Sequence, residues 1–149
     1  MLIILSASNL NRNNYDKWMQ RISVQTKSRT DFMNLDALIN QYIHEQDFIN
    51  GILTLFIPHT TAGITINENA DPDVPADMEK ILNRMVPWKN NYAHAEGNSA
   101  AHVKASMMGS SVILLIEDKR MQQGTWQSVY LCEFDGPRSR QIWMKGIPS

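Results

Sequence analysis

Residues 51–66, which read GILTLFIPHTTAGITI, decide the fold. The apolar and β-branched run 52–57 follows a glycine and ends at Pro58, and its length and composition are typical of a short buried strand. The segment 63–66 is again rich in β-branched residues and predicts a second strand. We therefore expect two strands whose connection, PHTTA, places polar side chains at the end of a sheet.

Apolar periodicity and capping residues predict further elements on both sides of this stretch. Asn34, Asp73 and Asn98 are suitable N-caps, and each precedes apolar residues at helical spacing. The predicted strands are 20–27, 52–57, 63–66, 111–117, 123–134 and 141–145, and the predicted helices are 35–44, 75–85 and 98–108. The expected class is α+β, with mostly antiparallel strands and two or three helices packed on the sheet.

Composition limits the number of domains and the kind of partner. The chain has 149 residues, of which 43% are hydrophobic, and a formal net charge of -1. It can bury one core, and its charge balance gives no reason to expect nucleic-acid binding. The low net charge favours burial of surface in an oligomer. Cys132 is the only cysteine, so an intrachain disulfide is excluded and a reducing, cytoplasmic compartment is expected.

The N-terminal residues differ in character from the rest of the chain. We assign residues 1–14 to a flexible extension and residues 15–149 to a single domain. The apolar run MLIIL at positions 1–5 is too short for a signal peptide or a membrane helix. No other stretch approaches the roughly 20 apolar residues that a membrane helix needs. We therefore expect no membrane partner.

The connection after the first quoted strand is the first candidate site. His59, Thr60 and Thr61 directly follow the end of the predicted buried strand 52–57. Their hydroxyls and the neighbouring backbone N–H groups can hold a phosphate, and His59 or His94 can handle a proton near neutral pH. The alternative is a local turn in which the two threonines bond the backbone.

Oxygen-bearing side chains follow the second strand. Asn67, Glu68 and Asp71 suit Mg²⁺, or a diphosphate held through a metal ion. The same residues also form ordinary turns and helix caps, so both interpretations stay open.

A third cluster surrounds the predicted helix at 98–108. With Asn98 as the N-cap, His102 stands at the end of the first turn, where the helix dipole favours neutral imidazole. Lys104 in the same helix can meet an anion. His59, His94 and His102 are compatible with Zn²⁺, although their spacing lacks the tight pattern of known zinc motifs. Solvated helix residues are the alternative for His102 and Lys104.

Four motifs follow one another along the chain. They are 58–68 with Asp71, 98–105 with His102 and Lys104, 124–127 (Gly124, Thr125, Trp126 and Gln127), and 133–138 with Arg138. In this order they closely resemble the YjbQ family, whose members are known as secondary thiamine-phosphate synthase enzymes. The ordered set is specific, whereas one motif alone would not be. The similarity extends from about residue 15 to residue 147 and excludes residues 1–14.

The resemblance implies an α+β homotrimer with a low thiamine-phosphate synthase activity. That reaction joins hydroxymethylpyrimidine diphosphate to thiazole phosphate and releases diphosphate. The resemblance also implies one polar cleft built from all four motifs, in which a divalent metal, Mg²⁺ or Zn²⁺, or an anion can bind. Many members carry a histidine or an acid two residues before the position of His102; this chain has Ala100 there, which predicts weaker metal binding.

The physical chemistry of the residues fits such a reaction. Diphosphate departure needs neutralising charge and no protein nucleophile. Lys104, Arg138 or a cation held by Glu68, Asp71 or the histidines can supply that charge. Trp126 offers a stacking face for a heterocycle, or belongs to the sheet core or the trimer interface; Arg138 can instead pair with Glu133. Two alternatives to the transferase remain: a non-catalytic trimer that binds a metal or a phosphorylated ligand, and a hydrolase of a phosphorylated metabolite.

Overall fold

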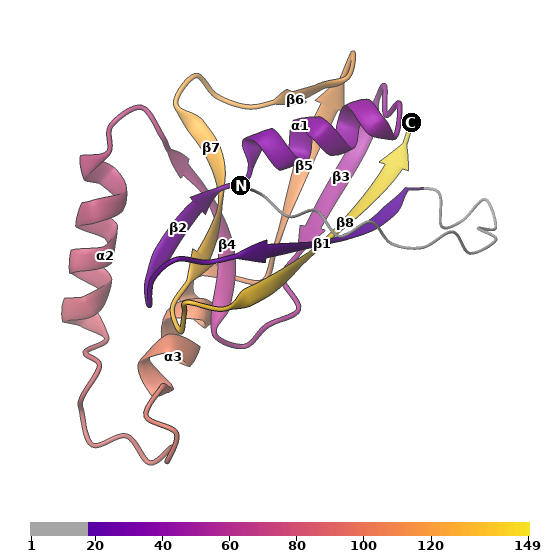
Figure 1. Cartoon of the computed structure of the whole chain (residues 1–149). Coiled ribbons are helices and arrows are strands. Elements are labelled where there is room, and N and C mark those ends of the chain that lie inside the picture. Colours follow the sequence, from indigo (N-terminus) through magenta and orange to yellow (C-terminus); the bar gives the residue numbers. More distant parts are fainter. Residues whose placement is uncertain (1–17) are drawn as a thin grey trace.

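The computed structural model describes residues 18–149, so the predicted extension 1–14 lies outside the described residues. The α+β class is confirmed, with three helices and antiparallel strands among residues 18–149 (Figure 1). In chain order the elements are β1 (Met19–Gln25), β2 (Asp31–Asn34), α1 (Asp36–Glu45), β3 (Gly51–Phe56), β4 (Ala62–Glu68), α2 (Asp73–Met85), α3 (Ser99–Met108), β5 (Ser111–Glu117), β6 (Arg120–Gln122), β7 (Gln127–Glu133) and β8 (Ser139–Pro148). No helix among residues 18–149 is long and apolar enough to cross a membrane.

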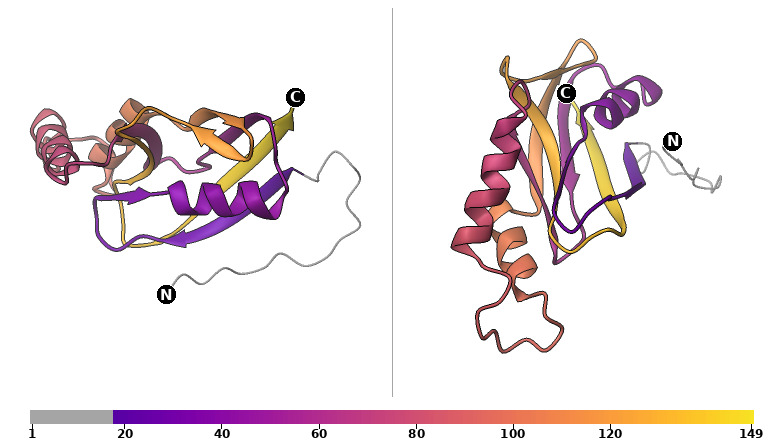
Figure 2. Two further views of the ribbon diagram at one scale, coloured as in Figure 1. Left: turned by 90° about the horizontal axis from the view of Figure 1, so that it is seen from above. Right: turned by 60° about the vertical axis from the view of Figure 1, so that its left-hand side comes forward.

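The strands form two antiparallel sheets. The larger sheet has the order β1-β8-β3-β5-β6, and the smaller has the order β2-β7-β4. The quoted stretch 51–66 therefore crosses from one sheet to the other, because β3 lies in the first sheet and β4 in the second. Figure 2 shows α2 and α3 along one side of the molecule and α1 on another.

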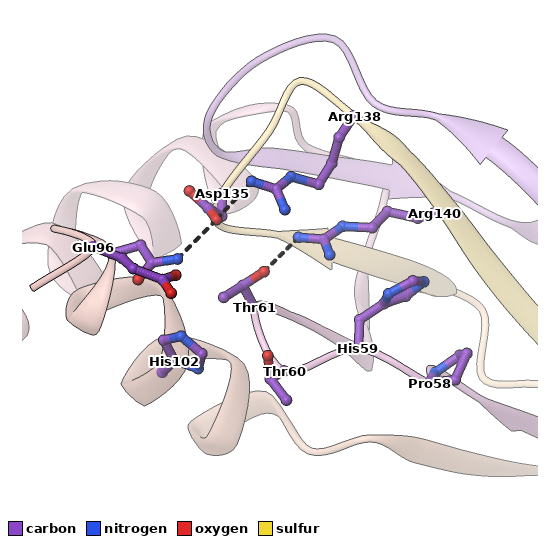
Figure 3. A pocket seen from close by; sticks show the side chains of 10 residues that line it. Pro58, His59, Thr60, Thr61, Glu96, His102, Asp135, Arg138 and Arg140 are labelled. Atoms are coloured by element: carbon purple, nitrogen blue, oxygen red, sulfur yellow. Dashed lines mark hydrogen bonds and ion pairs between the residues drawn. The ribbon is translucent and has the colours of Figure 1, made fainter. Parts of the chain in front are cut away.

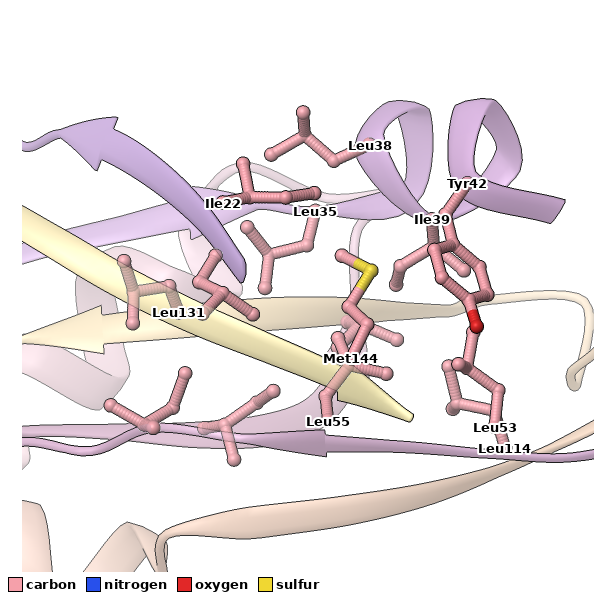
Figure 4. Close-up of a cluster of buried hydrophobic side chains, with 14 of the residues drawn as sticks. Ile22, Leu35, Leu38, Ile39, Tyr42, Leu53, Leu55, Leu114, Leu131 and Met144 are labelled. Carbon is pink, nitrogen blue, oxygen red and sulfur yellow. The ribbon is translucent and has the colours of Figure 1, made fainter. Parts of the chain in front are cut away.

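The main core lies between the inner faces of the two sheets and α1 (Figure 4). The predicted apolar face of the first helix is confirmed, since Leu38, Ile39 and Tyr42 are buried there. The five-stranded sheet contributes Leu53, Leu55 and Met144 to the same core. Each fully buried side chain of this size contributes roughly 1.5–3 kcal/mol to the free energy of unfolding.

A second, smaller core covers the opposite face of β7. Tyr130, Cys132 and Phe134 alternate with the main-core residues Val129 and Leu131, so β7 is buried on both faces. The partners are Leu82 of α2 and Ala101 and Ala105 of α3. Cys132 is fully buried in this core and packs as a small hydrophobic side chain.

A glycine lets α3 pack closely against β4. A Cβ atom at Gly63 would lie 2.7 Å from the carbonyl oxygen of Gly109 and 2.9 Å from Cβ of Met108. The Ile64 N–H donates to the same Gly109 oxygen over 3.0 Å. This contact fixes the end of α3 beside the beginning of β4.

Two short strands and several strand boundaries differ from the sequence prediction, and β8 is longer than the predicted strand 141–145. The strands β2 and β6 were not predicted, because they are four and three residues long and are defined by pairing with β7 and β5. The predicted strand 123–134 begins only at Gln127, because residues 124–127 form a turn in which the Gln127 N–H bonds the Gly124 oxygen over 3.0 Å.

The caps of two helices also differ from prediction. Helix α1 has Leu35 as its N-cap, and the Asn34 Oδ1 instead accepts the Asp36 N–H over 2.8 Å. Helix α2 includes the predicted cap Asp73, whose N–H bonds Asp71 Oδ1 over 2.9 Å. In both helices a short side chain two residues earlier satisfies the free N–H.

Candidate functional site

A polar cavity of about 340 Å³ opens beside the beginning of β4 (Figure 3). Its walls come from the β3–β4 connection, the segment before α3, the first turn of α3, the β7–β8 connection and the start of β8. Ten residues line it: Pro58, His59, Thr60, Thr61, Glu96, Asn98, His102, Asp135, Arg138 and Arg140.

Arg140 is the buried cation of this cavity, with 3% of its surface exposed. Its Nε donates to Glu133 Oε2 over 2.7 Å, and its Nη2 donates to Glu133 Oε1 over 2.5 Å. Nη2 also donates to the Thr61 hydroxyl over 2.7 Å. These bonds hold the guanidinium in one orientation and leave Nη1 as the nitrogen that they do not use.

Glu133 is a structural carboxylate and is fully buried. Beyond Arg140 it accepts hydrogen bonds from the Thr26 hydroxyl and from the N–H groups of Phe134 and Asp135, over 2.8–3.0 Å. Burial alone would raise the pKa of Glu133, but the bonds from Arg140, Asp135 and Thr26 outweigh it and lower the pKa. Glu133 therefore stays ionised and balances Arg140.

His59 has one ring nitrogen committed to the backbone. The Gln141 N–H donates to His59 Nε2 over 2.8 Å. Because a backbone N–H only donates, Nε2 is unprotonated and Nδ1 carries the proton. Burial, followed by the positive charge of Arg140, lowers the pKa of His59. His59 is thus a neutral N–H donor at pH 7.

The second arginine, Arg138, lies at the more open side of the cavity. Its Nη2 donates to Asp135 Oδ2 over 2.8 Å, and its side chain is 49% exposed. The Asn98 Nδ2 donates to the same oxygen over 3.1 Å, which ties the start of α3 to the β7–β8 connection. Arg138 therefore pairs with Asp135, and the pairing with Glu133 considered from sequence is made by Arg140 instead.

Two predicted metal ligands, His94 and His102, lie beside each other, and His102 lines the cavity. The rings of His94 and His102 are 5.4 Å apart, and His94 Nε2 lies 3.6 Å from Glu96 Oε2. Among residues 18–149, no group of three or more His, Cys, Asp and Glu side chains is arranged to hold a metal ion. His59 Nε2 is already occupied by a backbone donor. The three histidines do not form a ready site, and metal binding stays a prediction.

Lys104 lies outside the cavity lining, against the expectation that it meets the substrate. It is 1% exposed, and its Nζ donates to Asn83 Oδ1 over 2.5 Å. Nζ also lies 3.9 Å from the ring centre of Trp88. Burial lowers the pKa of Lys104. The side chain thus fastens α3 to the end of α2 and the segment after it.

The remaining predicted residues lie at the other end of β4. Glu68 pairs with Gln127 at that end, whereas Ala62 pairs with Glu133 beside the cavity. Six residue steps along a strand span roughly 20 Å. The single predicted cleft is therefore split in two. The far group comprises Asn67, Glu68, Asp71, Gly124, Thr125, Trp126 and Gln127.

The far group forms an ordered turn around an exposed aromatic ring. The Asn69 N–H bonds the Trp126 oxygen over 2.9 Å, and Gln127 Oε1 accepts the Gly124 N–H over 2.8 Å. Trp126 is 63% exposed, so it does not belong to the sheet core.

Sequence reasoning missed two cavity residues, Glu96 and Arg140, and did not single out Asp135 within the motif 133–138. Arg140 carried a usable signal, because it stands two residues after Arg138 and strand alternation directs both toward one face. A buried carboxylate at Glu133 was not foreseen as its partner, since burial of a charge depends on the complete fold.

Comparison with known proteins identifies the family. The model of the family described as UPF0047 protein YjbQ-like matches residues 20–149. The chain is 41% identical over 128 residues to the UPF0047 protein YugU of Bacillus subtilis, covering 85% of this chain and 97% of that protein. It is 41% identical over 131 residues to the UPF0047 protein MJ1081 of Methanocaldococcus jannaschii, covering 88% and 95%. The crystal structure of a YjbQ/UPF0047-family protein from Clostridium acetobutylicum gives a TM-score of 0.83 at 45% identity, covering 86% of this chain and 99% of that one. The chain therefore belongs to the UPF0047/YjbQ family.

Proposed function

We propose that the chain is a thiamine-phosphate synthase-type transferase with a low or secondary activity, and that the cavity at the beginning of β4 binds a phosphorylated substrate. One observation carries the proposal: the cavity brings Arg138, Arg140, His59 and the threonine hydroxyls together. These groups donate hydrogen bonds to anions, and Arg140 is oriented before any ligand arrives.

The transfer reaction requires correct positioning of the two substrates and stabilisation of charge, and it requires no protein nucleophile. The thiazole nitrogen attacks the methylene carbon of the pyrimidine, the carbon–oxygen bond to diphosphate breaks, and diphosphate leaves with the electron pair. Arg138, half exposed at the open side, can stabilise the departing charge. Glu96 and Asp135 on the same cavity can stabilise the positive charge that develops on the thiazolium ring. No step of this proposal runs through Mg²⁺ or Zn²⁺.

A diphosphate-release assay tests the proposal. The purified protein receives hydroxymethylpyrimidine diphosphate, thiazole phosphate and Mg²⁺, and diphosphate is measured over time. The negative control carries His59→Ala and His102→Ala, and the matched positive control carries Arg120→Gln, an exposed arginine on β6 that is absent from the cavity lining. We expect release by the wild type and by Arg120→Gln. Release no faster than in the double-histidine variant would refute the transferase.

The same donor groups also support a phosphate-ligand-binding protein without turnover. Glu133 holds Arg140 in a fixed orientation, and such an arrangement is sufficient to bind a phosphate group without any reaction. Saturable phosphate binding together with zero diphosphate release would favour this second candidate over the transferase.

Self-association as a homotrimer in the cytoplasm also remains a proposal. The outer face of the five-stranded sheet exposes Ile52, Ile113, Leu115 and Ile147 by 40–66%. Ile52 pairs with both Leu115 and Ile147, so these side chains are neighbours. An apolar face of this kind favours contact with another chain. Sedimentation equilibrium should give three times the 17.0 kDa chain mass, and a monomer mass at micromolar protein would contradict the proposal.

A further inference from the structure

The donors of the cavity gather around Arg140. Its Nη1 is used by none of the hydrogen bonds among the described residues, and the Thr61 hydroxyl accepts from Nη2 and so keeps its own proton available. His59 adds the N–H of Nδ1, because Nε2 accepts the Gln141 N–H. These groups come from the β3–β4 connection and the start of β8 (Figure 3). Arg140 Nη1, the Thr61 hydroxyl and His59 Nδ1 form a short array of groups that can donate to a ligand, which we call the donor wall.

The carboxylates of the cavity come from other segments. Glu96 precedes α3, and Asp135 follows β7. In Figure 3 Glu96 and His102 lie on the side of the view away from Arg140 and His59. Asp135 is shared by Arg138 and Asn98, whereas Glu96 is exposed and lies 3.6 Å from His94.

The balance of charge limits how much anion the cavity accepts. Arg140 is neutralised by Glu133 and Arg138 by Asp135, so the lining holds no uncompensated cation to offset a large anionic ligand. The donor wall can still saturate one tetrahedral group through directed hydrogen bonds. A second phosphate would extend toward the exposed Glu96, whose charge neither arginine neutralises, and like charges repel.

We propose that the donor wall is a subsite for one terminal phosphate group of a phosphate monoester, and that this subsite selects against diphosphates. The inference rests on the proposed function, since it names which phosphorylated substrate occupies the cavity. In the transferase, the phosphate of the thiazole substrate lies against Arg140, and the diphosphate substrate enters from the side of Arg138.

Titration calorimetry with simple probes tests the subsite without turnover. The probes are inorganic phosphate, ethyl phosphate and inorganic diphosphate, each without metal ions at one ionic strength. The variants are Arg140→Lys, Thr61→Val and Glu96→Gln, with Arg120→Gln as the matched control and circular dichroism as the check on folding. Thr61→Val keeps the shape of the side chain, so it serves where Arg140→Lys fails to fold.

Phosphate and ethyl phosphate should bind the wild type and Arg120→Gln alike, and diphosphate should bind about tenfold more weakly. Arg140→Lys should weaken ethyl phosphate binding by about ten- to a hundredfold, and Thr61→Val by about three- to tenfold, because charge-assisted or directed bonds are lost. Glu96→Gln should narrow the gap between ethyl phosphate and diphosphate, because it removes a repelling charge.

The outcomes separate the two proposals. Diphosphate that binds as tightly as ethyl phosphate, with both weakened in Thr61→Val or Arg140→Lys, overturns the monoester subsite and keeps the phosphorylated-ligand cavity. Ethyl phosphate binding that is unchanged in folded Arg140→Lys and Thr61→Val also overturns the subsite. Failure of all three probes to bind at millimolar concentration overturns both proposals.

Discussion

Replacing Glu133 by Gln tests the physical basis of the cavity most fully. The carboxylate is completely buried and accepts five hydrogen bonds, two of them from Arg140. The amide group of Gln replaces one acceptor oxygen by a donor. If it replaces Oε2 it faces Arg140 Nε and the Thr26 hydroxyl, and if it replaces Oε1 it faces Arg140 Nη2 and two backbone N–H groups. In the first case the Thr26 hydroxyl can donate to the Arg138 carbonyl oxygen, 3.0 Å away, and Arg140 Nε loses its partner; in the second case three donors lose theirs.

The larger effect of Glu133→Gln is electrostatic. Arg140 is left as a buried cation without its counterion, and removal of one partner of a buried ion pair typically costs about 3–5 kcal/mol. Domains of this size have a free energy of unfolding of about 5–15 kcal/mol, so the variant should stay folded but lose much of its stability. Urea unfolding at pH 7, followed by tryptophan fluorescence, measures the loss.

A double-mutant cycle separates the ion pair from other effects of the substitution. Glu133→Gln combined with Arg140→Gln should cost less than the sum of the two single variants, with a coupling of about 1–3 kcal/mol. A loss below about 1 kcal/mol in Glu133→Gln, together with additive single variants, would refute the reasoning.

The pH dependence of stability gives an independent check on Glu133. Burial alone would raise the pKa of Glu133, but the hydrogen bonds from Arg140 and its neighbours outweigh burial and lower the pKa below the ordinary value of 4.5. Between the lowered pKa of the folded chain and the ordinary value of 4.5, the unfolded chain binds more protons at Glu133 than the folded chain does. The free energy of unfolding therefore rises with pH in this range. The contribution is present above about pH 4.5 and is lost as the pH falls toward the lowered pKa. Glu133→Gln should therefore lose less stability than the wild type on acidification below pH 4.5, and an equal loss in both would contradict this account.

Three further predictions follow from single contacts. Gly63→Ala should lower the free energy of unfolding, measured in urea, by about 1–3 kcal/mol, because the new Cβ would lie 2.7 Å from the Gly109 oxygen. Gly124→Ala is the control, since its Cβ would meet only the flexible Gln127 side chain. Equal losses in the two variants would contradict the close packing of α3 on β4. Burial raises the pKa of Cys132 to about 12, so iodoacetamide at pH 8 should modify it only in urea, and rapid labelling of the folded chain would show that the thiol is accessible. Lys104→Met should leave ethyl phosphate binding within about twofold of wild type, since Lys104 bonds Asn83 outside the cavity; a tenfold loss in calorimetry would place it in the site.

The elements that could be predicted from sequence are those with a long, clean periodicity. Helix α1 carries an uninterrupted apolar stripe, and the apolar run of β3 is bounded by Gly51 and Pro58. The strands β2 and β6 have no such signal, because only their pairing with distant strands makes them strands. Helix α2 has a clear apolar stripe, yet only Leu82 is buried and Ile81 and Met85 stay exposed in the single chain.

The site was only partly predictable, because sequence spacing does not give distance along a strand. His59, Thr60, Thr61, Asn98 and Arg138 were expected together and do line one cavity. The polar residues before β4 and those after it are close in sequence and were predicted to form one cleft. Because β4 is an extended strand, its two ends lie about 20 Å apart.

Helical spacing misled in a related way at the start of α3. His102 lines the cavity, whereas Lys104, two residues further along the same helix, is directed toward Asn83 and Trp88 instead. Successive helix positions rotate by about 100°, so residues two apart lie on nearly opposite faces of a helix. The packing of α3 on β4 at Gly63 determines that His102, and not Lys104, is directed toward the cavity.

A crystal structure with bound thiazole phosphate tests the central claim most directly. Crystals are soaked at saturating concentration, and the phosphate group is located by its electron density. The account predicts phosphate oxygens within hydrogen-bond distance of Arg140 Nη1 and the Thr61 hydroxyl, with the thiazole ring extending toward Glu96. Thiazole phosphate bound at another place on the chain, with none of its density against Arg140, would contradict the account.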